Sequence, residues 1–230
     1  MKTLKQQTRL AGILYILLIL LGPFIIIYIP SMIIVEGNAS QTVENLLANE
    51  TLFRIGIFGE VLIFSIEILM VTTLYIIFRR VNRYYSLIGA ISRFGMVAIM
   101  GVNVIIYLAI LSIIRNPEFL IGFSGEQLDT LVLLLFNIHE NTVFVWGVFF
   151  AIHLAILGYL IFISEFAPKV IGYLIMIGSL GHIFDSLRVF FNMENSILLT
   201  VFSILLLVSF IGELSFTIWL LINKKTDELN

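Results

Sequence analysis

The stretch PKVIGYLIMIGSLGHIFDSLRVFF, residues 168–191, decides how this chain folds. It is apolar and long enough to cross a bilayer, which takes about 20 helical residues. Its second half nevertheless carries His182, Asp185 and Arg188. Ionisable side chains are costly inside hydrocarbon and usually mark a functional site. They must face other helices or water, so the rest of the chain is predicted to pack around this segment.

The polar residues of this segment share a face with glycines. Residues three or four apart lie on one side of a helix. One seam therefore carries Gly178, Gly181, Asp185 and Arg188, and the seam beside it carries Ser179, His182 and Ser186. Small residues let a second helix approach closely. The pattern predicts a close helix contact there and makes Asp185 the position expected to be most sensitive to substitution.

Composition places the chain in a membrane. Of its 230 residues, 60% are hydrophobic and 12% are charged, and the mean hydropathy is +1.09. Soluble domains are about 45–50% apolar and about 25% charged. The net charge of -2 and the lack of a basic run argue against nucleic acid as a partner. With no cysteine, thiolate nucleophiles and thiolate metal sites are excluded.

The apolar segments predict the architecture. Six of them approach the length of a membrane span, at about 10–29, 55–78, 86–114, 142–163, 169–191 and 197–222. We expect an all-α, polytopic helical bundle of six transmembrane helices, forming a single membrane domain over residues 1–230. Asn38 as an N-cap, and Ser124 with Gln127 as a capping box, predict further helix starts in the outer loops, where we expect short interfacial helices. Gly22-Pro23 predicts a kink in the first span.

The distribution of charge predicts orientation. Basic residues flank one end of the spans, at Lys2, Lys5, Arg9, Arg79, Arg80, Arg83, Lys169, Lys224 and Lys225. The opposite loops hold Glu36, Glu44, Glu50, Glu118, Glu126, Asp129 and Glu194, with Arg54 and Arg115 as exceptions. Lysine and arginine are enriched in cytoplasmic loops. We therefore expect a multi-pass protein of the cell membrane with both termini in the cytoplasm and the lipid bilayer as its surroundings.

Several stretches occur in the order of a known family: RLAGILYILLILLGPFIIIYIPSMIIVEGNASQTVENLLANETLFRIGI (9–57), NIHENTVFVWGVFFAIHLAILGYLIFISEFAPKVIGYLI (137–175), the pair Asp185-Ser186, and IGELSFTIWLL (211–221). Together they resemble a largely prokaryotic membrane family catalogued as domain-of-unknown-function family 4386. The resemblance covers nearly the whole chain. It implies a bacterial, multi-pass inner-membrane protein and no established activity. Where this chain has His182, the family pattern is expected to carry an aromatic residue.

Counting from the span ends sorts the buried polar residues by depth. An outer polar layer is predicted from Glu60, His139, Glu140, His182, Asp185 and Arg188. An inner layer is predicted from Arg93 and Glu213, which lie at compatible depths and are expected to form an ion pair. Near the middle of the membrane lie Glu67, Asn103 and His153.

Three interpretations of these groups are open. The first is a hydrogen-bonded network that serves packing. The second is proton or ion handling, since Glu60 and Glu67 share one face of the second span. The third is a divalent metal site that activates water for hydrolysis, with ligands among Glu60, His139, His182 and Asp185. No cofactor is predicted. The leading hypothesis is a non-enzymatic small transporter, sensor or assembly partner, and the alternative is an intramembrane metal-dependent hydrolase.

Overall fold

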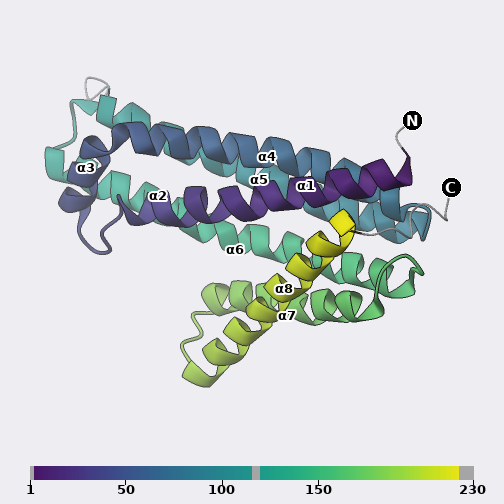
Figure 1. The fold of residues 1–230 in the computed structure, drawn as a ribbon. Coiled ribbons are helices and arrows are strands. Elements are labelled where there is room, and N and C mark those ends of the chain that lie inside the picture. Colours follow the sequence, from purple (N-terminus) through teal and green to yellow (C-terminus); the bar gives the residue numbers. More distant parts are fainter. Residues whose placement is uncertain (1–2, 116–119, 223–230) are drawn as a thin grey trace. The chain divides into compact units, whose positions relative to one another are not determined.

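The computed structural model describes residues 3–115 and 120–222, where it consists of helices and their connections, with no β-strand (Figure 1). The helices, in chain order, are α1 (Leu4–Gly22), the π-helix η1 (Pro23–Tyr28), α2 (Ile29–Ser31), α3 (Ala39–Ala48), α4 (Glu50–Phe78), α5 (Arg83–Arg115), α6 (Gly125–Ile163), α7 (Lys169–Phe190) and α8 (Ser196–Ile222). The predicted all-α class is confirmed.

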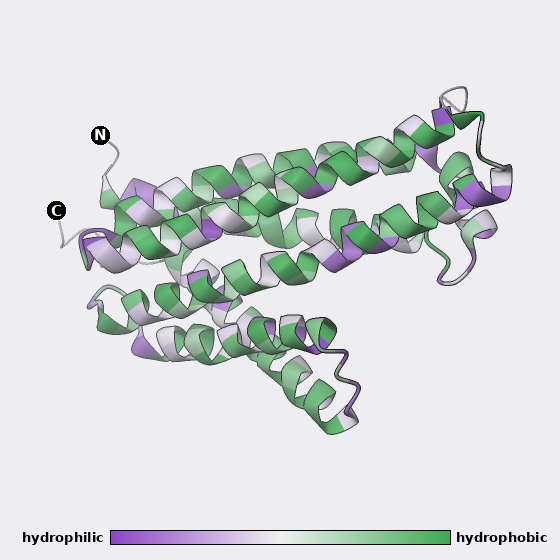
Figure 2. Cartoon of the chain, turned by 180° about the vertical axis from the view of Figure 1, so that it is seen from behind, coloured by the Kyte–Doolittle hydropathy of each residue, from purple (hydrophilic) through white to green (hydrophobic). Residues whose placement is uncertain are grey.

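Within the described residues, six helices are long and apolar enough to cross a membrane, as predicted. They are Leu4–Ser31, which joins α1, η1 and α2, then Glu50–Phe78, Arg83–Arg115, Gly125–Ile163, Lys169–Phe190 and Ser196–Ile222. Figure 2 shows them hydrophobic over most of their lengths, with hydrophilic residues gathered near their ends and connections. The fourth is the longest at 39 residues, because it begins at Gly125, well before the predicted span 142–163. Of the orientation signals, Lys2, Glu118, Lys224 and Lys225 lie outside the described residues.

Short polar side chains set the helix starts in the loops. The Asn38 side chain accepts a hydrogen bond from the Gln41 backbone N–H at 3.0 Å, which caps α3. Ser124 and Gln127 exchange side-chain to backbone hydrogen bonds of 3.3 and 2.8 Å, the predicted capping box of α6. At Pro23 the first span changes to the π-helix η1, a form that accommodates local irregularity in a helix.

The helices form two compact units. Unit 1 comprises residues 1–17, 66–97 and 144–230, and unit 2 comprises residues 18–65 and 98–143. Four of the predicted spans therefore contribute a segment to each unit, whereas α7 and α8 belong to unit 1 alone. The prediction of a single membrane domain stays a prediction.

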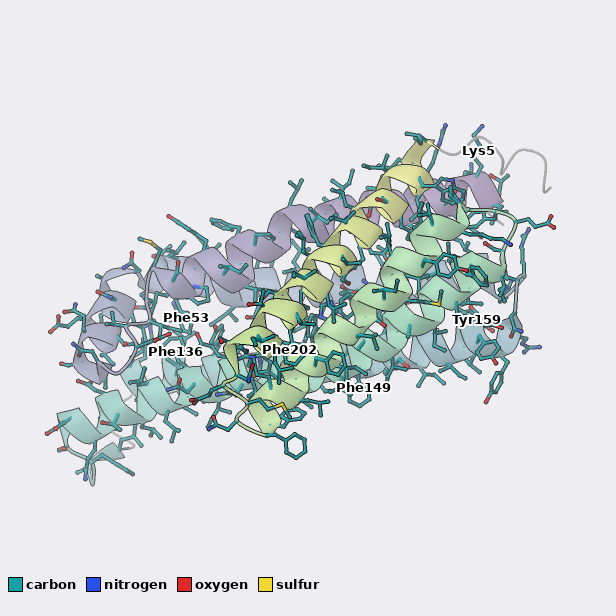
Figure 3. The ribbon with its side chains drawn as sticks, turned by 90° about the horizontal axis from the view of Figure 1, so that it is seen from below. Lys5, Phe53, Phe136, Phe149, Tyr159 and Phe202 are labelled. Atoms are coloured by element: carbon teal, nitrogen blue, oxygen red, sulfur yellow. The ribbon has the colours of Figure 1, made fainter. Side chains whose placement is uncertain are left out.

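An aromatic cluster forms the core of unit 2. Phe53, Tyr107 and Phe136 contact one another edge to face, with ring centroids 4.9 to 5.7 Å apart. Two of them, Phe53 and Phe136, lie next to each other in Figure 3. Ile33 and Leu46 are fully buried against this cluster, so the loop helix α3 packs onto the ends of the spans and is not a free surface helix.

Glycines bring α7 and α8 together in unit 1. A Cβ atom on Gly178 would collide with the backbone of Ser209, and one on Gly181 with the backbone of Leu206. From the other side, a Cβ on Gly212 would press on Ile175. The close contact predicted from the Gly178–Gly181 seam is thus present, and α8 is its partner.

Candidate functional site

Arg93 is the centre of the polar site in unit 1. This α5 side chain is among the largest fully buried ones in the described part of the chain, with 1% of its surface exposed. Glu67 of α4 holds it through two hydrogen bonds, from Nε at 2.6 Å and from a terminal nitrogen at 3.1 Å. The fork of a guanidinium matches the two oxygens of a carboxylate, so α4 and α5 are joined by a bidentate buried ion pair.

The same guanidinium reaches two further helices. Its other terminal nitrogen lies 2.9 Å from Nε2 of His153 on α6 and 3.4 Å from the hydroxyl of Tyr15 on α1. Arginine can only donate, so Nε2 accepts, and Nδ1 carries the ring proton that it donates to the Gly89 carbonyl at 2.8 Å. His153 is therefore a neutral ring that its two contacts hold in one tautomer.

A serine links the remaining two helices. The hydroxyl of Ser209 on α8 donates to the Glu213 carboxyl at 3.3 Å and lies 3.3 Å from Nε2 of His182 on α7. When the hydroxyl donates to the carboxyl, its oxygen is free to accept a hydrogen bond from the N–H of the imidazole. The result is a short hydrogen-bonded chain from His182 to Glu213.

The predicted ion pair between Arg93 and Glu213 is wrong. The carboxylate in contact with the guanidinium is that of Glu67, although Glu213 is near enough to interact electrostatically with both. Depth along the spans placed Arg93 and Glu213 together, but direct contact also depends on which faces of the helices meet. In total, each of the six spans contributes a side chain to this group, which we call the Arg93 cluster: Tyr15, Glu67, Arg93, His153, His182, Ser209 and Glu213.

Unit 2 has a second buried polar group. The Nε2 atom of His139 on α6 lies 3.2 Å from the carboxylate of Glu60 on α4, and both side chains are buried. The imidazole ring is stacked on Tyr107, with centroids 3.6 Å apart. Asn103 of α5 donates to the His139 carbonyl at 3.0 Å. Glu60 and His139 were both predicted in the outer layer, and the structure brings them into contact.

The other predicted outer residues lie elsewhere. Glu140 is exposed in unit 2. In unit 1, Asp185 forms an ion pair with Arg188 one turn along α7 at 2.9 Å, and both side chains are about one-third exposed. The Arg188 guanidinium also lies over the Phe144 ring, 5.7 Å from its centroid. Membership of all six residues in one outer layer stays a prediction.

The two basic exceptions to the predicted charge distribution have a common explanation. Arg54 and Arg115 both contact the carboxylate of Glu50, at 2.8 and 2.7 Å. Their charges are thus partly balanced by one acidic residue at the start of α4.

A metal site is not assembled among the described residues. No three histidine, aspartate, glutamate or cysteine side chains there are grouped so that they could hold an ion. The closest arrangement is the pair Glu60 and His139, which supplies two ligand types suited to zinc. A bound divalent metal stays a prediction.

Sequence reasoning missed one member of the Arg93 cluster and gave another no role. Tyr15 sits in an apolar run where an aromatic residue is unremarkable, and its single signal is a hydroxyl at the depth of Arg93. Ser209 resembles many membrane serines that bond back to their own helix. Neither residue stands out until the facing helices are known.

Comparison with known proteins gives a family and a relative for this chain. Residues 10–223 match a family described as "Domain of unknown function (DUF4386)". This chain belongs to that family. An uncharacterized protein of Archaeoglobus fulgidus is 30% identical to the chain over 149 residues, which cover 61% of this chain and 85% of the relative. No solved structure matches. Membership, together with six apolar helices, indicates a multi-pass membrane protein, and the family has no specific activity attached to it.

Proposed function

We propose that this protein is a non-enzymatic small transporter or sensor that responds to protons through the Arg93 cluster. The observation that carries the proposal is the charge count of the cluster. Two carboxyl groups, Glu67 and Glu213, interact with a single guanidinium. Burying a net charge is costly, so with both of its histidines neutral the cluster carries no net charge when one carboxyl binds a proton. Glu67 is committed to the bidentate pair, which leaves Glu213 as the group that takes up and releases the proton.

The surroundings of Glu213 suit this role. Hydrogen bonds connect its carboxyl through the Ser209 hydroxyl to the imidazole of His182. Proton relays in membrane proteins are built from such chains of carboxylate, hydroxyl and histidine side chains. Loss or gain of one proton changes the net charge of the side chains around Arg93. Because each span contributes a residue, a local change in charge acts on the packing of the whole of unit 1.

Orientation belongs to the same proposal. We infer that both termini are cytoplasmic, because the basic residues Arg79, Arg80 and Arg83 between α4 and α5 lie at the same predicted side as Lys5 and Lys169. The apolar helices indicate that the lipid bilayer surrounds the protein.

The test uses the full chain reconstituted in liposomes that enclose a pH-sensitive dye, together with tryptophan fluorescence between about pH 5 and 9. Both tryptophans belong to unit 1, and Trp146 contacts the His182 ring edge to face with centroids 6.5 Å apart. Proton flux identifies a transporter, and a pH-dependent emission change without flux identifies a sensor. Glu213→Gln should abolish either response.

Glu126→Gln, at the exposed start of α6, is the matched control and should behave as the wild type. A wild-type protein without flux and without a pH-dependent emission change would refute the proposal, as would a Glu213→Gln variant that keeps the response. Metal analysis addresses the hydrolase alternative. Stoichiometric zinc that is lost in His139→Ala would favour it, and we expect no such stoichiometry.

A further inference from the structure

A cavity of about 250 Å³ lies at one end of unit 1. It is formed by the first turn of α1, the end of α4 with the residues that follow it, and the connection between α6 and α7. Its lining is mostly apolar, with Ser164 and two charged residues added: Leu4, Ile77, Val81 and Phe166, then Arg80 and Glu165.

The two charged residues are the unusual feature of this cavity. Arg80 and Glu165 have opposite charges and line the same space, yet neither is ion-paired with the other or with another residue in the described ranges. Both side chains are exposed, so their donors and acceptors are available to a ligand. A lone anion would be repelled by Glu165 and a lone cation by Arg80, whereas a molecule that carries both charges is attracted at each end.

We propose that this cavity binds a small zwitterion, with its carboxylate or phosphate on Arg80, its ammonium group on Glu165 and an apolar portion against the remaining lining. A guanidinium recognises carboxylate and phosphate oxygens through paired hydrogen bonds. Ligand pockets for drug-sized molecules measure about 300–1,000 Å³, so this smaller space suits a group the size of an amino acid. Two sources supply this chemistry: a free neutral amino acid, or the headgroup of phosphatidylethanolamine.

Calorimetry on the purified full chain tests the proposal, with a panel of neutral amino acids and leucine as the main probe. Leucinamide lacks the carboxylate and 4-methylpentanoate lacks the ammonium group, so each should bind at least about tenfold more weakly than leucine. Arg80→Gln and Glu165→Gln should each weaken binding by about 10- to 100-fold, the loss expected for a hydrogen bond to a charged group. Arg79→Gln removes a neighbouring arginine that does not line the cavity and should leave the affinity unchanged.

Nanodiscs distinguish the two sources. If the headgroup is the ligand, discs of phosphatidylethanolamine should block leucine binding and discs of phosphatidylglycerol should not. The lipid that co-purifies with Arg80→Gln should then be depleted in phosphatidylethanolamine. The proposal is overturned if neither probe binds, if binding is indifferent to Arg80→Gln and Glu165→Gln, or if Arg79→Gln weakens it equally. Because Glu213 is intact in these variants, the outcome is independent of the proton response.

Discussion

Among single residues, Arg93 places the greatest demand on its surroundings. A fully buried guanidinium has five N–H groups to satisfy, and Glu67, His153 and Tyr15 provide its hydrogen-bond partners. Two aromatic rings also flank it, with Tyr15 at 5.4 Å and Phe150 at 5.7 Å from its central carbon to their centroids. Contacts of this kind stabilise a cation that has left water. Arg93 therefore joins three other helices of unit 1 through its hydrogen bonds.

The first prediction concerns this ion pair. Arg93→Met and Glu67→Gln should each destabilise the protein, with about 3–5 kcal/mol expected when one partner of a buried pair is removed. The double variant should be less destabilised than the sum of the two single variants. Thermal or denaturant unfolding in detergent measures the coupling. A coupling that is larger for Arg93 with Glu213 than for Arg93 with Glu67 would show that the wrong carboxylate has been assigned.

The second prediction concerns Asp185, which the sequence singled out as the most sensitive position. Its partner Arg188 lies on the same helix, and both side chains are partly exposed. Ion pairs of this kind contribute about 0–1 kcal/mol. Asp185→Asn should therefore cost far less stability than Arg93→Met, and Arg188→Gln should cost about as little. The free energies of unfolding are compared in the same detergent. A loss of several kcal/mol for Asp185→Asn would contradict this prediction and show that Asp185 is essential for the fold.

Among elements, the contact between α7 and α8 depends on the absence of side chains. Helices in a membrane gain little from the hydrophobic effect against each other, so close packing of small residues holds them together. Gly178 and Gly181 bring the backbone of α7 against that of α8. This contact also sets the distance between His182 and Ser209, so packing and the hydrogen-bonded chain to Glu213 depend on the same two glycines.

The third prediction tests that dependence. Gly178→Ala forces a methyl group against the Ser209 backbone, and overpacking of this kind costs about 1–3 kcal/mol. The control is Gly101→Ala on α5, where a Cβ atom has no neighbour within 4 Å. Alanine is there the better helix former by about 1 kcal/mol, so this variant should be neutral or more stable. Equal melting temperatures for the two variants would argue against the close approach.

At the scale of the whole molecule, charge at the span ends determines how the chain inserts. The fourth prediction is that reporter fusions after Arg83 and after Asn223 read as cytoplasmic, and fusions near Ala48 and Asn116 as external. The physical reason is the excess of lysine and arginine at one side of the membrane. A cytoplasmic signal near Ala48 would contradict the proposed orientation, and a fusion that is silent at every position would be repeated with a second reporter.

The sequence by itself determined the helical class, the six apolar helices and the burial of polar residues such as Glu60, Arg93 and His153. Hydrophobic length and the cost of buried charge depend on local composition, and these are readable along the chain. The helix caps at Asn38 and Ser124 were predictable for the same reason, because a cap acts over three residues.

The tertiary structure alone decided which polar groups meet. Position along a span gives depth, and depth was shared by Arg93 and Glu213, yet Glu67 makes the contact because its helix presents that face to α5. The partner of the glycine seam and the contact of Glu60 with His139 were open in the same way. Each of these contacts joins two different helices, and the rotation and neighbours of a helix follow from packing over the whole bundle.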